Sequence, residues 1–491
     1  MFQLLKIRPA YLLAITLVLH ILLHSAFLKL PPCSIHVWRQ CNTLAVARNF
    51  FEEDNNLFKP RVDTRGTQNG VTGMQFPAYE WGLANIYKIT GEHFIVHRIY
   101  SLVISCFALV AIALFFGLLF NNRHYGVLAS WIICWSPEFF YHSINALPDI
   151  LAFCFGFFAL YFSYKWKIRR ERQDQFLSFL FITMGGLIKI QFGIFGIFMA
   201  VSIFLPDKNK LALTIHQKRN WFLYGAFSIL LISFWYWYAH YLIESSNLRD
   251  FVLQIRPVNN VTQAWSIIKK NLLSDFPELL INYANVALLV LGMMVSITKI
   301  NLKNPKHLAL LASIILSLLW YVLMLEQMRV HQYYMLPFLL ISTIFILKGI
   351  QHLVNRKKYF IIYPLLLALP VLAAVRILPA RWMKDDLGIP IEFAVSNMRQ
   401  QLIDAIPVTK GVIVGPDKSA CIWLYFLHKK GYSFDDVNFF LTDTITGNNL
   451  AAYRKQGALY LYMKHDLIIK DDSTLKYLQS IGDIDIYQIQ Y

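Results

Sequence analysis

Residues 33–87 read CSIHVWRQCNTLAVARNFFEEDNNLFKPRVDTRGTQNGVTGMQFPAYEWGLANIY, and they form the first long stretch outside an apolar run. This stretch brings charged, amide and indole side chains into one loop between two apolar runs: Trp38, Arg39, Asn42, Arg48, Asp63, Arg65, Glu80 and Trp81. Most of the remaining chain is apolar. We therefore interpret residues 29–97, here called the first loop, as the functional face of a protein whose other parts hold it at a membrane surface.

The composition favours a membrane protein. Of the 491 residues, 57% are hydrophobic and only 15% are charged, whereas a soluble domain carries about 25% charged residues. The net charge of +17 comes from short basic clusters between apolar runs, which is typical of loops that orient membrane helices. A nucleic-acid face would instead show a basic stripe on a soluble domain. We expect membrane lipids as partners and no nucleic acid.

Apolar runs of about the length that crosses a bilayer recur along the chain. They cover 12–28, 98–120, 125–141, 150–166, 176–188, 192–205, 221–242, 279–297, 308–325, 333–347 and 360–377. The predicted fold is mainly α, a polytopic helical bundle of about eleven spans within residues 1–378. The runs 176–188 and 192–205 are short, and a single broken or re-entrant segment is the alternative there.

Every second loop between these runs is basic. The clusters contain Lys6 and Arg8, then Arg123, then Lys165 to Arg172, then Lys208, Lys210, Lys218 and Arg219, then Lys299, Lys303 and Lys306, then Arg356 to Lys358. By the positive-inside rule these loops face the cytoplasm. The amino terminus is then cytoplasmic, and the first loop and the tail after residue 379 are extracytoplasmic.

The tail, 379–491, has a different pattern. Strands are expected at 411–415, 459–463 and 484–490, and a helix at 419–430 that Gly431 closes. Alternating strands and helices indicate a small α/β domain. It contains neither a GxGxxG motif nor a P-loop, so the sequence gives no support for phosphate binding there.

The six cysteines carry little information about the site. Cys33 and Cys41 share the first loop and are able to pair in an oxidising compartment, but two free thiols fit the sequence equally well. No cysteine or histidine spacing of a zinc site is present. We predict no metal ligands.

Three residues near the outer ends of the spans are candidates for chemistry. Arg39, next to Trp38, is suited to clamp a phosphate with its planar guanidinium or, equally, to anchor the helix at the interface. Asp63 is a candidate general base, although an Asx turn or a salt bridge to Arg61 or Arg65 explains it as well. Asp149 follows Pro148 and either caps the next helix or faces the site.

A second group is cationic or phenolic. Lys189 interrupts an apolar run on the outer side, where a lysine requires an anion or the membrane surface. Arg329, His331, Tyr333 and Tyr334 open a late span from outside. Such groups suit a lipid phosphate, although tyrosines are also common at bilayer interfaces.

Taken together, these motifs resemble the bacterial multi-span glycosyltransferases of the GT-C class, which are related to protein O-mannosyltransferases and aminoarabinose transferases. The resemblance rests on Trp38–Thr43 (WRQCNT), Ala47–Phe50 (ARNF), Pro60–Gly66 (PRVDTRG), Gln75–Tyr79 (QFPAY), Ala146–Asp149 (ALPD), Lys189, His331–Tyr334 (HQYY) and Tyr425–Gly431. It extends along most of the chain, and the first-loop motifs are its most specific part.

The resemblance implies a transferase in the bacterial inner membrane that takes a sugar from a polyprenyl-phosphate donor. The acceptor would be a glycan, a lipid or a protein, and no cofactor is needed, with any divalent metal left open. Lys189, Arg39, Arg329, His331, Tyr333 and Tyr334 would bind the donor phosphate, and Trp38, Gln40, Asn42 and Arg65 complete the first-loop motif.

Two amides depart from the family pattern. Asn42 stands where members carry Asp, and Gln75 stands where they carry Glu before Phe-Pro. An amide takes no proton from a hydroxyl at neutral pH, so the base is predicted to be Asp63, with Glu80 and Asp149 in reserve. A relative without activity, or a polytopic lipid or solute transporter, is the alternative.

Overall fold

The computed structural model describes residues 7–204, 213–248, 251, 258, 260–298, 300, 305–434, 444–470 and 474–490. Lys6, Lys208, Lys210, Lys299 and Lys303 of the basic clusters lie outside these residues. The chain divides into two compact units. The first unit comprises 1–29, 97–236 and 253–383, and the second comprises 30–96, 237–252 and 384–491.

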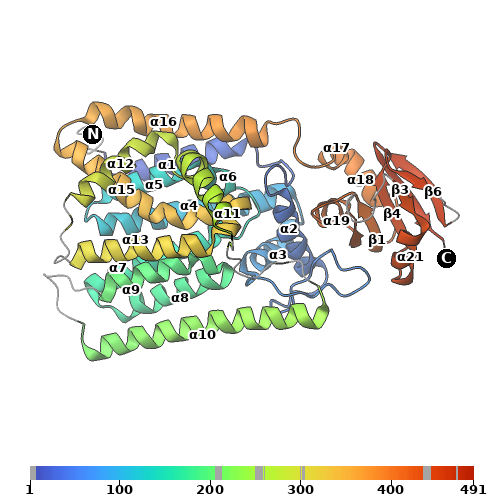
Figure 1. Ribbon diagram of the computed structural model, residues 1–491, viewed down its shortest axis with the longest axis horizontal. Helices are drawn as coiled ribbons and strands as arrows, with labels where there is room; N and C mark the ends of the chain where they lie inside the picture. The colour runs from blue at the N-terminus through green and yellow to red at the C-terminus, as the bar shows by residue number, and fades with distance from the viewer. Residues whose placement is uncertain are drawn as a thin grey trace. The chain divides into compact units, whose positions relative to one another are not determined.

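The first unit is helical, and in it α7, α8, α9 and α13 lie side by side (Figure 1). Its helices are α1 (Pro9–Ser25), α5 (Arg123–Cys134), α6 (Pro137–His142), α7 (Asp149–Arg169), α8 (Arg172–Ile188), η2 (Ile190–Gly193), α9 (Ile194–Phe204), α11 (Val261–Lys270), η3 (Asn271–Leu280), α12 (Tyr283–Ile297), α13 (Pro305–Leu323), α14 (Leu325–Val330), η4 (Gln332–Phe338), α15 (Leu339–Asn355), α16 (Tyr359–Ile377) and η5 (Leu378–Trp382). Two further helices, α4 (Phe94–Leu119) and α10 (Ile215–Ser246), contribute residues to both units.

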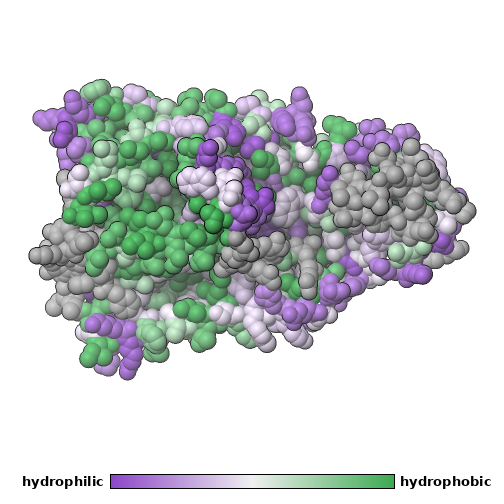
Figure 2. Space-filling model, viewed as in Figure 1, coloured by the Kyte–Doolittle hydropathy of each residue, from purple (hydrophilic) through white to green (hydrophobic). Residues whose placement is uncertain are grey.

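Each of the eleven apolar runs coincides with one or more of these helices. Among the residues that the structure describes, four helical segments are long and apolar enough to cross a membrane: Phe94–Leu119, Ile215–Ser246, Gln332–Asn355 and Tyr359–Trp382. The pair Val261–Leu280 and Tyr283–Ile297, bent by 112°, makes a fifth if it counts as one span. The prediction of about eleven spans is therefore confirmed only in part among the described residues. Figure 2 shows apolar side chains gathered over this helical part.

Breaks in the helices are compensated by side chains from neighbouring helices. Pro370 has no N–H to donate to the carbonyl of Leu366 one turn earlier, and that oxygen accepts a hydrogen bond of 3.0 Å from Trp131 Nε1 instead. Asn282, between η3 and α12, donates to the carbonyls of Trp135 (2.9 Å) and Leu369 (3.0 Å). An unsatisfied carbonyl costs several kcal/mol in hydrocarbon, so these contacts let the helices break within the bundle.

In the second unit, the first loop is itself folded. It contains α2 (Val37–Glu52) and α3 (Ala78–Thr90), and nearly all of α2 is buried. Neither helix was predicted, because α2 is short and mixes charged, amide and apolar residues on every face.

The tail forms the predicted small α/β fold. A five-stranded sheet has the order β2-β1-β4-β7-β6, in which β1 (Lys410–Gly415) runs parallel to β2 (Lys430–Ser433) and β4 (Tyr460–Lys464). The strands β6 (Leu475–Ile481) and β7 (Ile484–Ile489) are antiparallel. The remaining elements are α17 (Ile391–Ala394), α18 (Ser396–Asp404), α19 (Ile422–Leu427), β3 (Thr444–Thr446), α21 (Gly447–Lys455) and β5 (Ile468–Lys470).

The expected end of the tail helix was wrong. We predicted a helix over 419–430 closed by Gly431, but α19 ends at Leu427, and His428 adopts the left-handed conformation that terminates it. Gly431 instead lies in β2, where an added Cβ would be only 2.0 Å from the carbonyl oxygen of Val412. The glycine is thus required for strand pairing.

The turn Pro60–Gly66 of the first loop pairs with the edge strand β2. Thr64 forms a parallel bridge with Gly431, the amides of Arg65 and Gly66 donate to the Gly431 carbonyl, and the Gly431 amide donates to the Asp63 carbonyl. The first loop is therefore a structural extension of the tail sheet.

Helices α12 and α15 pack through a pair of glycines. A Cβ on Gly292 would lie 1.8 Å from the carbonyl oxygen of Phe345, and one on Gly349 would lie 2.2 Å from that of Leu288. We expect Gly292→Ala to lower stability by about 1–3 kcal/mol because overpacking forces the backbones apart. A drop in the thermal unfolding midpoint of the detergent-solubilised protein measures this.

The matched control is Gly225→Ala on α10, where the nearest atom to an added Cβ is Phe179 Cε1 at 3.8 Å. That variant should unfold at the wild-type temperature or slightly above it, since alanine favours helix. Equal midpoints for the two variants would contradict the close packing of α12 and α15.

Candidate functional site

The first unit brings together predicted residues from three separate segments. Asp149 lies in the first turn of α7, and Lys189 lies between α8 and η2, with its Nζ 3.5 Å from Asp149 Oδ2. Gln191 Nε2 donates a hydrogen bond of 2.8 Å to Asp149 Oδ1. Asp149 Oδ2 has no hydrogen-bond partner among the described residues, so the side chain serves this group of residues rather than the end of its own helix.

Two tyrosines complete the surroundings of Lys189. Its Nζ is 5.6 Å from the ring centre of Tyr333 and 5.5 Å from that of Tyr334, which is within the range of cation–π attraction. His331 stacks on Tyr333 at 5.4 Å between ring centres. We call Asp149, Lys189, Gln191, Tyr333 and Tyr334 the Lys189 cluster.

A histidine–carboxylate pair beside this cluster was not predicted. On α6, His142 Nε2 lies 2.9 Å from Glu138 Oε1, and the His142 ring meets the Tyr333 ring edge-on at 5.7 Å. Both side chains are buried. Their spacing of four residues places them on one face of a helix, and this was the only signal available before the structure.

Arg329 differs from the other predicted phosphate ligands. Its Nε and Nη2 donate hydrogen bonds of 2.9 and 2.7 Å to Glu326 Oε1, and half of its side chain is exposed. A surface pair of this kind contributes little stability. Arg329 is therefore held mainly by a surface ion pair with Glu326.

In the second unit, Asp63 forms the centre of a buried ion pair. Arg48 pairs with Asp63 Oδ2, and Asn49 Nδ2 donates a hydrogen bond of 2.9 Å to Asp63 Oδ1. Arg48 also donates to the carbonyl oxygen of Tyr425 at 3.0 Å. Burial opposes its charge, but the carboxylate of Asp63 raises the pKa of Arg48 above its ordinary value. Both carboxylate oxygens of Asp63 are thus occupied.

Arg65 is similarly engaged. It contacts the two carboxylate oxygens of Glu53 at 2.9 and 2.6 Å and donates to the Asn69 carbonyl at 2.7 Å. Lys430 also reaches Glu53, at 2.6 Å. Burial acts against the Glu53 carboxylate, but hydrogen bonds from Arg65 and Lys430 outweigh it and lower the pKa of Glu53 to about 2. Arg65 therefore fixes the first loop.

Arg39 is the predicted cation with the fewest polar contacts. It is 4% exposed, and its guanidinium lies 4.8 Å from the ring centre of Phe251. Within the described residues, the guanidinium makes no ion pair. Arg39 is therefore available to a phosphate, since Arg recognises that group bidentately.

The neighbours of Arg39 on α2 are mainly structural. Gln40 donates to the Cys33 carbonyl at 3.0 Å, and the Trp38 carbonyl accepts from Cys421 Sγ at 3.2 Å. Asn42 is buried one turn after Arg39. Cys33 and Cys41 form no disulfide with each other, so the pairing that the sequence left open is not made.

Two other motif residues are buried at the start of α3. Glu80 lies in the first turn of α3 and is fully buried. Gln75 is 5% exposed, and its Nε2 has no hydrogen-bond partner among the described residues. A buried amide donor without a partner is costly, so this position is suited to a ligand or water oxygen.

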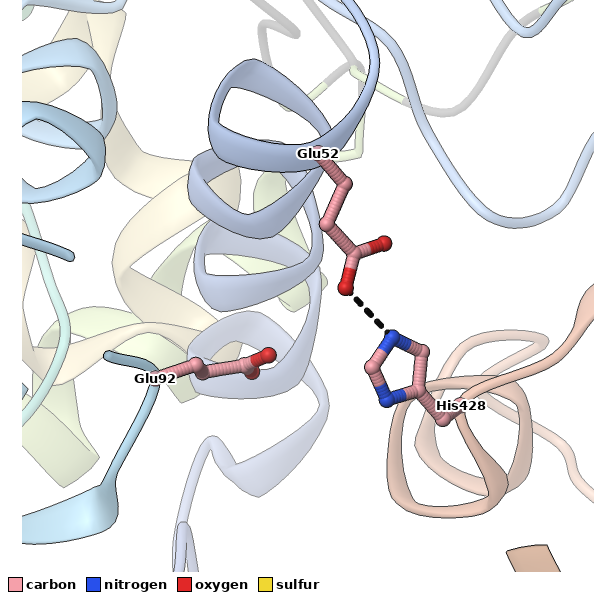
Figure 3. A group of neighbouring side chains, drawn as sticks. All are labelled: Glu52, Glu92 and His428. Carbon is pink, nitrogen blue, oxygen red and sulfur yellow. Dashed lines mark hydrogen bonds and ion pairs between the residues drawn. The ribbon is translucent and has the colours of Figure 1, made fainter. Parts of the chain in front are cut away.

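One further group in the second unit has the side chains of a metal site. Glu52, Glu92 and His428 each offer a ligand atom, and these atoms lie within 4.8 Å of one another (Figure 3). None of the three was among the predicted site residues.

Comparison with known proteins identifies the fold. The model of the family described as dolichyl-phosphate-mannose-protein mannosyltransferase matches residues 75–237. No relative was found among curated protein sequences. The oligosaccharyltransferase of Archaeoglobus fulgidus, in complex with zinc and sulfate, superposes with a TM-score of 0.62 at 11% identity, over 93% of this chain and 68% of that one.

Two other solved structures share the fold. ArnT from Cupriavidus metallidurans, in the apo state, has a TM-score of 0.59 at 8% identity, over 96% of this chain and 97% of that one. The arabinofuranosyltransferase AftD from Mycobacteria has a TM-score of 0.60 at 13% identity, over 99% of this chain and 42% of that one. The resemblance to the GT-C glycosyltransferases is confirmed, and the chain has their fold.

The contacts of Asp63 predict a large loss of stability on its replacement. Asp63→Asn leaves the Arg48 charge buried without its carboxylate, and breaking such a pair costs about 3–5 kcal/mol. The thermal unfolding midpoint, followed by tryptophan fluorescence, should fall by many degrees. The control Asp386→Asn removes a carboxylate with a 71% exposed side chain, 3.6 Å from Lys384, and should have almost no effect. A stable Asp63→Asn protein would show that the pair does not hold the second unit.

Proposed function

We propose that the protein is a membrane glycosyltransferase that moves a sugar from a polyprenyl-phosphate donor to an acceptor on the extracytoplasmic side. The Lys189 cluster is the observation that carries this proposal. It places an ammonium group, a carboxylate and two phenol rings together inside an apolar helical bundle. Such a group is costly in that environment and is typically functional.

A lipid phosphate matches the cluster in charge and in position. An anion beside Lys189 would pair with the ammonium, while its lipid chain lies among apolar helices. Two solved structures of the same fold support this ligand class: ArnT from Cupriavidus metallidurans bound to undecaprenyl phosphate, and the Archaeoglobus fulgidus oligosaccharyltransferase in complex with an inhibitory peptide and a dolichol-phosphate.

The proposed reaction is a displacement at the anomeric carbon. An acceptor hydroxyl gives its proton to a carboxylate and forms the new bond to the anomeric carbon. The bond between that carbon and the phosphate oxygen breaks, and polyprenyl phosphate leaves with the electron pair. Lys189 stabilises the charge that develops on the leaving oxygen, which is usually a large part of catalysis.

The three candidate bases differ in what surrounds them. Both oxygens of Asp63 are occupied by Arg48 and Asn49, which favours a structural role for this residue. Asp149 lies within the Lys189 cluster, and Glu80 is buried in the first loop. We therefore assign the acceptor proton to Asp149, with Glu80 as the second candidate.

The remaining phosphate ligands follow from their contacts. Arg39 is buried beside Phe251 without an ion pair among the described residues, so we assign it to the donor. His331 stacks on Tyr333 and supports the ring that faces Lys189. Arg329 is bound to Glu326 in a surface ion pair.

The side of the membrane is part of the proposal. The basic loops support a cytoplasmic amino terminus and a tail domain outside a bacterial inner membrane. The glycan, lipid or protein that accepts the sugar lies on that outer side. No cofactor is required, because the donor carries its own leaving group.

A binding protein that has lost catalysis is the second candidate. The buried amides Asn42 and Gln75, which stand in place of carboxylates, favour it. The purified protein in nanodiscs, given a panel of polyprenyl-phosphate sugars and an envelope extract, distinguishes the two. Release of polyprenyl phosphate, followed by mass spectrometry, supports the transferase. Saturable donor binding without release supports the binding protein. If the protein shows neither release nor binding, a polytopic lipid or solute transporter is the remaining alternative.

Replacement of Lys189 tests the phosphate site. Lys189→Met should reduce polyprenyl phosphate release about 100-fold or more, the usual effect of removing one group that stabilises transition-state charge. The control is Lys165→Met, which removes another lysine–aspartate pair, the 2.8 Å contact with Asp174. Lys165 lies 16 residues from Asp149 on α7, about 24 Å along the helix. Unchanged release in Lys189→Met would refute the site.

Paired aspartate variants test the base. Asp149→Asn should abolish release while saturable donor binding remains, because an amide accepts no proton from the acceptor. Asp63→Asn, measured at a temperature where it is folded, should retain activity per folded molecule. If folded Asp63→Asn loses activity and Asp149→Asn keeps it, Asp63 is the general base instead.

A further inference from the structure

We propose that Glu52, Glu92 and His428 bind a divalent transition-metal ion, for which zinc is the best match, and that this ion joins the first loop to the tail within the second unit. The three residues come from separate elements. Glu52 is the last residue of α2, Glu92 precedes α4, and His428 follows α19. The site is independent of the proposed transferase reaction.

The geometry is close to that of a ligand set. Figure 3 shows the three side chains directed toward a common space, and their ligand atoms lie within 4.8 Å of one another. Ligands about 2.0–2.1 Å from a tetrahedral metal are about 3.3 Å apart. His428 Nε2 and Glu52 Oε1 are now 2.6 Å apart, so a small rotation of either side chain opens room for the ion.

Glu92 is an independent reason to expect a cation. Its side chain is four-fifths buried, and among the described residues its carboxylate has no hydrogen bond, only a 3.9 Å contact with Arg48 Nη1. A carboxylate that is enclosed and accepts no hydrogen bond among the described residues would be stabilised by a nearby metal ion.

The charge balance of the surrounding network leads to the same conclusion. The carboxylates of the network are Glu52, Glu53, Asp63 and Glu92, and its permanent cations are Arg48, Arg65 and Lys430. Four negative groups therefore share three positive ones, and Arg61 with Asp54 adds one charge of each sign. The excess negative charge lies beside Glu52 and Glu92, where either a protonated His428 or a bound metal ion balances it.

The ligand types favour zinc over harder ions. Zinc binds both imidazole nitrogen and carboxylate oxygen, whereas magnesium and calcium prefer oxygen ligands alone. Three protein ligands leave the fourth position for water. Lys430, 3.4 Å from Glu52 Oε2, remains as a hydrogen-bond donor to the ligand carboxylate, as outer-shell groups of metal sites commonly do.

Calorimetry tests the proposal on full-length protein without a polyhistidine tag, in nanodiscs, after dialysis against EDTA. Titration with zinc chloride should give one ion per chain and raise the thermal unfolding midpoint, since a ligand of the folded state stabilises it. Magnesium chloride should give neither effect. Absence of zinc binding by the wild type would overturn the proposal.

Variants locate the ion. His428→Ala and the nearly isosteric Glu92→Gln should each weaken zinc binding at least tenfold. The control is His465→Ala, which removes an exposed histidine 3.0 Å from a single carboxylate, Asp485, and should bind zinc as the wild type does. Wild-type affinity in both His428→Ala and Glu92→Gln would overturn the assignment, and if the first fails to fold, Glu92→Gln alone decides.

Discussion

The buried pair of Arg48 and Asp63 holds the second unit together. Arg48 comes from α2, Asp63 from the turn that extends the tail sheet, and the Tyr425 carbonyl that Arg48 also contacts comes from α19. A single guanidinium thus joins three segments separated by up to 377 residues. Because a buried arginine without its carboxylate is strongly destabilising, the path of the first loop and the position of the tail depend on this pair.

The same constraint explains how the other charges are distributed. Arg65 and Lys430 share Glu53, Lys165 pairs with Asp174, and Lys189 lies beside Asp149. Each of these cations has a carboxylate close by, which offsets the cost of desolvation. Among the described residues of the first loop, Arg39 is a buried cation without an ion pair, and for that reason it is well placed to engage an external anion.

Much of the helical architecture could be predicted from the sequence, because membrane-length apolar runs have few other interpretations. The breaks could not, since they depend on which distant side chain satisfies a freed carbonyl, as Asn282 does for Trp135 and Leu369. The helix α2 was missed because its buried residues include charged and amide side chains, so no separate apolar face indicates it. The helix α3 has an apolar face formed by Tyr79, Leu83, Ala84 and Tyr87, and this face was not recognised. The end of α19 was misplaced by assigning the helix stop to Gly431, which is a strand residue.

The candidate site divides in the same way. Residue type predicted that Asp149, Lys189 and the tyrosines of the HQYY segment belong together, and the structure brings them into contact. Residue type could not distinguish a carboxylate that serves chemistry from one that serves folding, because Asp63 and Asp149 are equally plausible by spacing. Glu138 and His142 were missed, since a histidine four residues after a glutamate is common on helices and only packing against Tyr333 gives the pair meaning.

The asparagine at position 42 affects proton transfer and anion binding in opposite ways. A carboxylate at position 42 would lie one helical turn from Arg39, where residues three apart on a helix interact, and it would compete with a phosphate for that guanidinium. An asparagine there carries no charge and leaves Arg39 to an external anion. The substitution removes a base from the first loop but improves its electrostatic fit to a phosphate. Asn42 is therefore more consistent with a first loop that binds an anion than with one that takes a proton.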